Sequence, residues 1–286
     1  MVLQFATRKQ FSMAKIVSPK KSRSKKSAAK EDKSVSKSGK KDNGGSENLT
    51  AAEFTRELNK LASPGELKKI EGYFKSGEGQ YSEGDKFIGV RMGQIFALAK
   101  KFMDMQPKEI EKLLESPIHE LRVGAVSIMD FQARDRKTAA ERLKELYELY
   151  INRHDRVNNW DLVDRSAPYV VGGYLADKPR NTLYKLARSK DMWERRTAIV
   201  STFYFIRKGD IDDTFKIAEI LVNDKEDLIN KAVGGWIREA GKRDPQRLLK
   251  FLDKHAATMP RTALRYAIEK LDAKKKKYYM ELKGKN

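Results

Sequence analysis

The sequence predicts an all-α fold, and three observations support that prediction. Apolar residues recur at intervals of three and four after residue 49, a spacing typical of amphipathic helices. Thr50 followed by Glu53, and Ser63-Pro64 followed by Glu66, have the spacing of N-terminal capping boxes. No convincing alternation of apolar and polar residues predicts a strand. Breaks between helices of ordinary length are expected at Asp177–Pro179, Gly209–Asp210 and Asp244–Pro245.

A weak internal repeat predicts how these helices are arranged. We expect comparable amphipathic helices to open at Arg165-Ser-Ala167, Arg196-Thr-Ala198 and Arg265-Tyr-Ala267, with Lys231-Ala232 at the equivalent place between the last two. The steps of 31, 35 and 34 residues are typical of stacked helix pairs. They favour an α-solenoid of HEAT-like helical repeats, in which one helix layer lines a concave basic surface. An irregular helical bundle is the alternative.

The composition changes near residue 49 and predicts two regions. Residues from about 13 to 48 are rich in Lys, Ser, Gly and Asn and cannot bury enough apolar surface to fold. We expect residues 1–48 to form a disordered basic tail and residues 49–286 to form one solenoid domain. Pro19 to Lys26, PKKSRSKK, resembles a nuclear-localisation or nucleic-acid-binding patch, and the first fifteen residues could be an organelle transit peptide. An intracellular protein is expected, with its compartment left open.

The positive charge is divided between the tail and the predicted domain. The chain carries 60 Lys and Arg against 40 Asp and Glu, a net charge of +20. The tail holds 13 basic and 4 acidic residues and so accounts for +9, which leaves +11 for residues 49–286. A basic folded part favours a polyanionic partner, because neutralising phosphates releases condensed counterions. A merely soluble cationic surface is the alternative.

Several classes of protein are excluded by what the sequence lacks. There is no cysteine, which excludes disulfides, thiolate nucleophiles and most structural zinc sites. The three histidines, His119, His154 and His255, lie far apart without metal-binding spacing. No apolar run is long enough to cross a bilayer. We therefore expect a soluble protein, monomeric, with no metal and no cofactor.

The residues most indicative of chemistry lie in NNWDLVDRSAPYVVGGYL. Trp160 and Asp164 are four residues apart, so both lie on one helix face. Pro168 lacks the N–H that would bond the carbonyl of Asp164, so a kink is expected there. An indole beside a carboxylate suits a catalytic site. Taken alone, however, a helical tryptophan is more often a core residue and a helical aspartate more often a solvated one.

The chain resembles the DNA alkylation repair enzymes of the AlkD type over about residues 85 to 271. Its landmarks are KFIGVRMGQIFALAKK (Lys86 to Lys101), SPIHELRVGAVSIM (Ser116 to Met129), NNWDLVDR (Asn158 to Arg165), DMWERRTAIVSTFYFIRKG (Asp191 to Gly209) and INKAVGGWIREAGKRD (Ile229 to Asp244). The resemblance implies a HEAT-like solenoid and a monofunctional DNA glycosylase that excises positively charged N3- or N7-alkylated purines, with alkylated double-stranded DNA as the expected partner.

Three catalytic residues follow from that resemblance. Trp160 and Asp164 match the family's WDxxD motif, and Arg196 matches its arginine in the following repeat. A cationic alkylpurine is already a good leaving group, so a fixed carboxylate suffices to stabilise the oxocarbenium-like transition state or to orient water. Trp160 is expected to pack on the sugar or modified nucleotide. Arg196 is expected to hold a neighbouring phosphate.

The resemblance also implies DNA-binding residues in KAVGGWIREAGK. The family commonly has a single glycine followed by tryptophan here, and in this chain Gly235 takes the tryptophan's position. Trp236 is displaced by one residue, which rotates its side chain by about 100° around the helix axis and away from the DNA-facing position. Arg238 keeps its register and is the candidate phosphate contact. The other DNA-binding candidates are Lys231, Lys242 and Arg243.

Two further hypotheses remain open. A non-catalytic solenoid that binds DNA backbone or unusual DNA structures would keep the affinity without base release. A protein-binding helical scaffold would be insensitive to salt in its behaviour toward DNA, since phosphate contacts are what make binding salt-dependent.

Overall fold

The computed structural model describes residues 49–74 and 77–282 of the chain. By its internal contacts the chain divides into two units, Met1–Glu47 and Asn48–Asn286. The expected tail, residues 1–48, lies outside the described residues, so its disorder stays a prediction. All the helices named below belong to the second unit.

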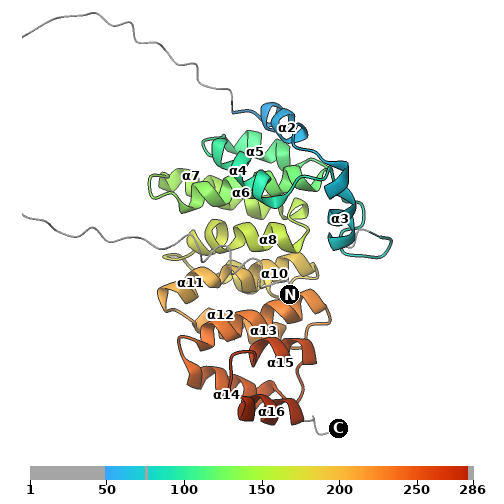
Figure 1. Ribbon diagram of the computed structural model, residues 1–286. Helices are drawn as coiled ribbons and strands as arrows, with labels where there is room; N and C mark the ends of the chain where they lie inside the picture. Colours follow the sequence, from blue (N-terminus) through green and yellow to red (C-terminus); the bar gives the residue numbers. More distant parts are fainter. Residues whose placement is uncertain (1–48, 75–76, 283–286) are drawn as a thin grey trace, which may run out of the picture. The chain divides into compact units, whose positions relative to one another are not determined.

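Helices, most of them joined by short turns, make up the second unit (Figure 1). Its first half contains α2 (Ala51–Asn59), α3 (Pro64–Phe74), α4 (Met92–Lys101), α5 (Pro107–Leu114), α6 (His119–Arg134), α7 (Ala140–Asn152), the 3₁₀-helix η1 (His154–Arg156), α8 (Trp160–Ser166) and the π-helix η2 (Ala167–Gly173). Its second half contains α9 (Asn181–Leu186), α10 (Met192–Ser201), α11 (Phe203–Lys208), α12 (Asp212–Leu221), α13 (Asp227–Gly241), α14 (Pro245–His255), α15 (Arg261–Ala267) and α16 (Ala273–Glu281). Within the described ranges there is no β-strand beyond one isolated parallel bridge, Lys86 to Ile118.

The helices stack in chain order. Helices α6, α8, α10, α13 and α15 contact one another in succession and form a ladder through the unit. A second set packs beside the ladder, with α5 on α6, α9 on α10, and α12 and α14 on α13. Stacked pairs of this kind bury their apolar faces against their neighbours, so one core runs through the whole unit. The predicted all-α solenoid fold is confirmed.

The basic residues of the internal repeat lie on ladder helices, but not at the helix starts where the sequence pattern predicted them. Arg165, Arg196, Lys231 and Arg265 belong to α8, α10, α13 and α15, which are successive ladder helices. Arg165 and Arg265 lie in the last turns of their helices, and Arg196 lies in the middle of α10. The expectation that these residues open their helices is therefore wrong. The repeat recorded positions that are equivalent in packing, whereas the starts of α8 and α10 are fixed by their N-cap residues Asn159 and Asp191.

Most local signals for helix ends are confirmed, although at Ser63 it is the backbone carbonyl that accepts the Glu66 N–H, at 3.1 Å. The Thr50 side chain accepts the Glu53 N–H at 3.2 Å at the start of α2. Asp244 caps α14 in the same way, accepting from the Arg247 N–H at 3.0 Å, with Pro245 as the first helical residue. Gly209 ends α11 with φ of 87°, a left-handed conformation that glycine adopts without steric cost.

Two glycines let ladder helices approach closely. A Cβ atom at Gly172 would lie 2.2 Å from the Ser201 carbonyl oxygen, and one at Gly234 would lie 2.2 Å from the Ala263 carbonyl oxygen. Neither position has room for a side chain. Gly234 therefore fixes how α13 seats against α15, and with it the direction of the following Gly235 and Trp236.

Candidate functional site

Asp164 and Arg196 form a bidentate ion pair between α8 and α10. Arg196 donates from Nε to Asp164 Oδ1 at 2.9 Å and from Nη2 to Oδ2 at 2.8 Å. Its remaining nitrogen, Nη1, donates to the Leu228 carbonyl at 2.6 Å, where α13 begins. The Arg196 side chain is 3% exposed and that of Asp164 13%. The carboxylate is thus held rigidly by three successive ladder helices while one side stays open to solvent.

Two opposing effects act on the Asp164 carboxyl. Burial raises the pKa of Asp164 above its ordinary value, because the charged form loses hydration. The charge and the hydrogen bonds of Arg196 oppose that shift, and the nearby Asp161 adds to it. A rigid, partly desolvated carboxylate stabilises a positive charge more strongly than a hydrated one does.

Trp160 is the first residue of α8 and is half-buried. The Asn159 side chain accepts the Trp160 N–H at 2.8 Å and fixes the helix start. The indole stacks on Phe74, with centroids 5.7 Å and planes 19° apart. Tyr73 meets it edge-on at 6.0 Å. The start of α8 is therefore packed against α3, a helix about ninety residues earlier in the chain.

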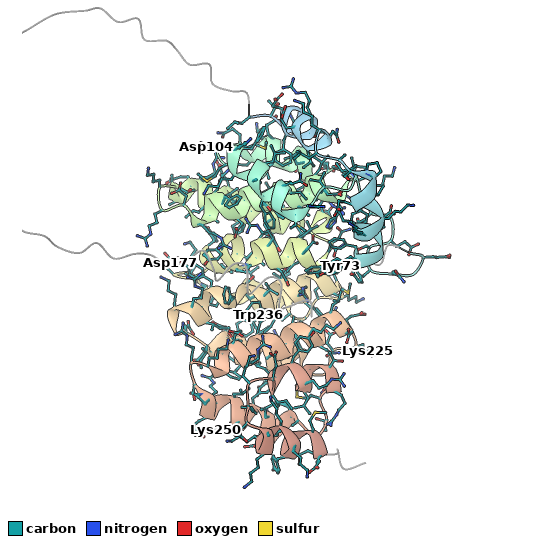
Figure 2. All side chains as sticks on the ribbon, in the orientation of Figure 1. Tyr73, Asp104, Asp177, Lys225, Trp236 and Lys250 are labelled. Carbon is teal, nitrogen blue, oxygen red and sulfur yellow. The ribbon has the colours of Figure 1, made fainter. Side chains whose placement is uncertain are left out.

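A set of aromatic residues that the sequence reasoning missed surrounds Trp160. Tyr73 is 48% exposed and lies on the same side of the molecule as Lys225, opposite Asp177 and Lys250 (Figure 2). Tyr81, from the turns between α3 and α4, contacts Trp193 of α10 with ring centroids 6.3 Å apart. No local pattern links these residues to Trp160, because only the packing of α3 onto the ladder brings them together.

A buried ionic cluster lies beneath Trp160. His119 Nε2 is 2.8 Å from Asp161 Oδ2, and His119 Nδ1 is 3.4 Å from Asp85 Oδ2. Arg122 donates to the other oxygen of Asp85. Burial disfavours the charged imidazole, but the carboxylates of Asp161 and Asp85 outweigh it and raise the pKa of His119 to about 9. The sequence reasoning considered this histidine only as a metal ligand and missed the cluster.

The cluster connects the site to the segment before α4. Asn159 donates from Nδ2 to Ser82 Oγ at 2.7 Å and to Asp85 Oδ2 at 3.3 Å. Asp85 and Asp161 therefore hold the 82–85 segment and the first turn of α8 on opposite sides of His119. The position of Trp160 depends on this clamp.

The predicted irregularity at Pro168 is present. Helix α8 ends at Ser166 and the chain continues as the π-helix η2, since Pro168 has no N–H to bond the Asp164 carbonyl. Ser166 donates its hydroxyl to the Leu162 carbonyl at 2.7 Å in the last turn of α8. The catalytic candidates Trp160 and Asp164 both precede the change of helix type.

In the structure the five DNA-binding candidates are largely engaged with other groups of the protein. Trp236 is 7% exposed and packs on Phe203 at 5.0 Å. Arg238 is buried and pairs with Glu269 and with Glu239. The remaining contacts are Lys231 to Asp227 at 2.5 Å, Lys242 to Glu239 at 2.6 Å, and Arg243 Nε to the Ile206 carbonyl at 3.1 Å.

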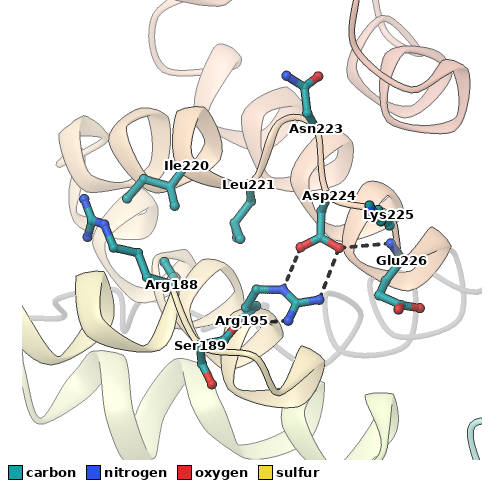
Figure 3. Close-up of a pocket in the computed structure, with 10 residues that line it drawn as sticks. Arg188, Ser189, Arg195, Ile220, Leu221, Asn223, Asp224, Lys225 and Glu226 are labelled. Carbon is teal, nitrogen blue, oxygen red and sulfur yellow. Dashed lines mark hydrogen bonds and ion pairs between the residues drawn. The ribbon is translucent and has the colours of Figure 1, made fainter.

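A shallow pocket of about 500 Å³ lies between the turns that precede α10 and α13 (Figure 3). Arg195 forms its wall and binds Asp224 through Nε at 2.6 Å and Nη2 at 3.3 Å. Arg195 also donates to the carbonyls of Ser189 and Lys190. Trp160, Asp164 and Arg196 do not line it. Its polar groups hold adjacent turns together, which is a structural role.

The described residues contain neither a candidate metal site nor a candidate membrane-spanning helix. Across 49–74 and 77–282, no group of three His, Cys, Asp or Glu side chains is placed to hold a metal ion. Over the same ranges, no helix has the length and apolarity required to span a membrane.

Comparisons with known proteins agree with the fold and identify a relationship. The family model for the DNA alkylation repair enzyme matches residues 54–271. A solved structure from Enterococcus faecalis, described as a predicted DNA alkylation repair enzyme, superposes with a TM-score of 0.58 at 18% sequence identity. That match covers 74% of this chain and 98% of the other. No curated protein sequence matches the chain.

Proposed function

Since the chain belongs to the DNA alkylation repair enzyme family, which supports a role in DNA repair, we propose that it is a monofunctional DNA glycosylase. Its proposed substrates are N3- and N7-alkylated purines, whose bases carry a positive charge. Asp164 is the proposed catalytic carboxylate, with Trp160 and Arg196 beside it. The bidentate Asp164–Arg196 pair carries the proposal, because it fixes a carboxylate in a partly desolvated place.

The proposed reaction breaks the bond between C1′ of the deoxyribose and N9 of the alkylated purine. The bonding electron pair leaves with the base and neutralises its positive charge, so no acid is needed to protonate the leaving group. Positive charge develops on C1′ and the ring oxygen, where the Asp164 carboxylate stabilises it. Water then adds to C1′ and loses a proton, which leaves an abasic site and a neutral base.

Arg196 is proposed as a positioning residue. All three guanidinium nitrogens of Arg196 donate to protein acceptors, Nε and Nη2 to Asp164 and Nη1 to the Leu228 carbonyl. This geometry supports a role in orienting the carboxylate rather than the phosphate contact that the sequence resemblance implied. Trp160 is proposed to cover the sugar and exclude water, a role that its half-exposed indole permits.

The test is the release of 7-methylguanine or 3-methyladenine from methylated DNA. The wild-type protein should release alkylated base, and Asp164→Asn should reduce the rate by at least about 100-fold, the usual size of a lost electrostatic contact in a catalytic site. Asp177→Asn is the matched control, because Asp177 is an aspartate with an 81% exposed side chain. Absence of release by the wild type, or equal rates for Asp164→Asn and wild type, would refute the proposal.

A non-catalytic DNA-binding protein is the second candidate, and the burial of Trp236 favours it. Trp236 is 7% exposed and offers little surface to DNA, so of the two tryptophans Trp160 and Trp236 only Trp160 is available to contact a nucleotide. This candidate predicts salt-dependent DNA binding with no base release. The same methylated-DNA assay, combined with a binding titration, separates it from the glycosylase.

A further inference from the structure

A cationic surface lies where η2 packs against α6 and α11. Its five residues form a connected set of contacts: Arg134 at the end of α6, Tyr169 in η2, and Tyr204, Arg207 and Lys208 in α11. We call them the cation–aromatic stripe. Arg134, Arg207 and Lys208 are exposed, and the two tyrosines are half-buried.

The tyrosine rings hold the cations of the stripe. The Arg134 guanidinium lies 3.8 Å from the centroid of the Tyr169 ring. Arg207 donates to the Tyr169 hydroxyl, and its guanidinium lies 6.0 Å from the same ring. Tyr169 meets Tyr204 edge-on at 5.6 Å, and Lys208 Nζ lies 5.9 Å above the Tyr204 ring. The rings fix the cations at the surface without neutralising them.

The charge of the stripe is poorly compensated. Arg134 shares the single carboxylate of Asp130 with Arg165, at 2.8 Å and 3.2 Å. In the described part of the chain, neither Arg207 nor Lys208 has a carboxylate within ion-pair distance. Lys231, Arg238 and Lys242, by contrast, each pair with an acid. The stripe therefore keeps more free positive charge than the region that the sequence resemblance indicated.

Cations at helix C-termini also stabilise the helix dipole, and that effect explains part of the pattern. It does not explain why Tyr169 and Tyr204 lie under three cations from two helices, α6 and α11. Holding a guanidinium over a ring reduces the conformational entropy that it would lose on binding. Such an arrangement is suited to a ligand with regularly spaced negative charges.

We propose that the cation–aromatic stripe binds the sugar–phosphate backbone of DNA next to the Asp164 site. The proposal rests on the proposed function for its choice of partner. Tyr169 follows Asp164 by five residues in the continuous α8–η2 segment, so the stripe and the Asp164 site belong to one stretch of the stack. A DNA backbone bound at the Asp164 site continues over the stripe.

The rings of the stripe are covered by cations and so are not base-stacking platforms. Binding at the stripe is therefore independent of sequence and of damage, because phosphates are the same in every DNA. This property separates the stripe from the Trp160–Asp164 site, where the alkylated nucleotide itself is recognised.

The experiment measures binding of the full-length protein to an undamaged 20-base-pair DNA duplex over a range of salt concentrations. The double variant Arg207→Ala/Lys208→Ala should weaken binding roughly tenfold at low salt and reduce the slope of log K against log salt by about 2, since each phosphate contact contributes about 0.9. The matched control is Arg188→Ala/Lys225→Ala, which removes the same two charges from exposed positions at the pocket of Figure 3. The control should change affinity less than threefold, roughly a single weak contact.

A third variant separates geometry from charge. Tyr169→Leu keeps every charge but removes the ring and hydroxyl that hold Arg134 and Arg207, so binding should weaken severalfold. Equal losses in the stripe and control variants, or no loss in the stripe variant, would overturn the proposal. Undamaged DNA makes this result independent of base release, so the stripe can fail while the glycosylase stands, and the reverse.

Discussion

Asp164 and Arg196 are joined by two parallel hydrogen bonds of 2.9 and 2.8 Å across two ladder helices, although 32 residues separate them in the chain. The arginine is almost fully buried, whereas the carboxylate keeps an open side. The pair therefore differs from a structural ion pair that is buried on all sides. We interpret Asp164 as a carboxylate positioned to stabilise a cation that reaches it from solvent.

The first prediction concerns the coupling within this pair. Arg196→Ala leaves the Asp164 carboxylate buried without its partner and should lower the free energy of unfolding by about 3 kcal/mol. Asp164→Asn in the same chain should recover part of that loss, because the amide carries no charge. A double-mutant cycle from urea unfolding of the wild type, both single variants and the double variant measures the coupling. Additive losses would contradict the coupling.

The second prediction concerns the pH dependence of base release. Because burial raises the pKa of Asp164 above its ordinary 3.8, and the reaction needs the ionised form, the rate should fall on acidification at a higher pH than an ordinary aspartate would give. Arg196→Lys keeps the charge but loses the two parallel hydrogen bonds, so in this variant the rate should begin to fall at a still higher pH. Rates are measured on methylated DNA after subtraction of spontaneous base loss at each pH. If the pH at which the rate of base release falls were the same in Arg196→Lys as in the wild type, the positioning role would be contradicted.

The third prediction concerns His119 and stability. The carboxylates of Asp161 and Asp85 raise the pKa of His119 from 6.5 to about 9 in the folded protein. The stabilisation from the charged imidazole is then fully present below pH 6.5 and is lost as the pH rises through about 9. Denaturant unfolding between pH 6 and 10 should show this loss, roughly those limits following from the two pKa values.

Two variants control the third prediction. His119→Gln should be less stable and should lack the decline over this range. His255→Gln should keep it, since burial lowers rather than raises the pKa of His255. The same decline in His119→Gln as in the wild type would assign it to other groups.

The fourth prediction separates the two tryptophans. Trp236→Ala removes an indole that is 7% exposed and packed on Phe203, and should lower the free energy of unfolding by about 3 kcal/mol. Trp160→Ala should cost less stability, because its indole is half-exposed, but should reduce base release more strongly. Unfolding and base release are measured on both variants. If Trp236→Ala removed activity at unchanged stability, a DNA-facing role for Trp236 would be supported instead.

Much of the fold was predictable because its signals are local. The Thr50 and Asp244 caps and the break at Gly209 depend on residues within one turn of each other. The pairing of Trp160 and Asp164 on one helix face follows from helix geometry in the same way. Even the repeat was visible, although it marked equivalent packing positions rather than helix starts.

The helical solenoid and the family resemblance could be read from the sequence alone, which also singled out Asp164 as the proposed catalytic carboxylate. The partners and neighbours of that carboxylate depend on how distant segments pack. The stacking of segments 30 to 90 residues apart placed Arg196 on Asp164, His119 between Asp85 and Asp161, and Phe74 on Trp160. The same stacking buried Trp236 and gathered Tyr169, Tyr204 and their cations. The physical reason is that charge pairing and desolvation depend on distances between helices, which no local spacing in the sequence records.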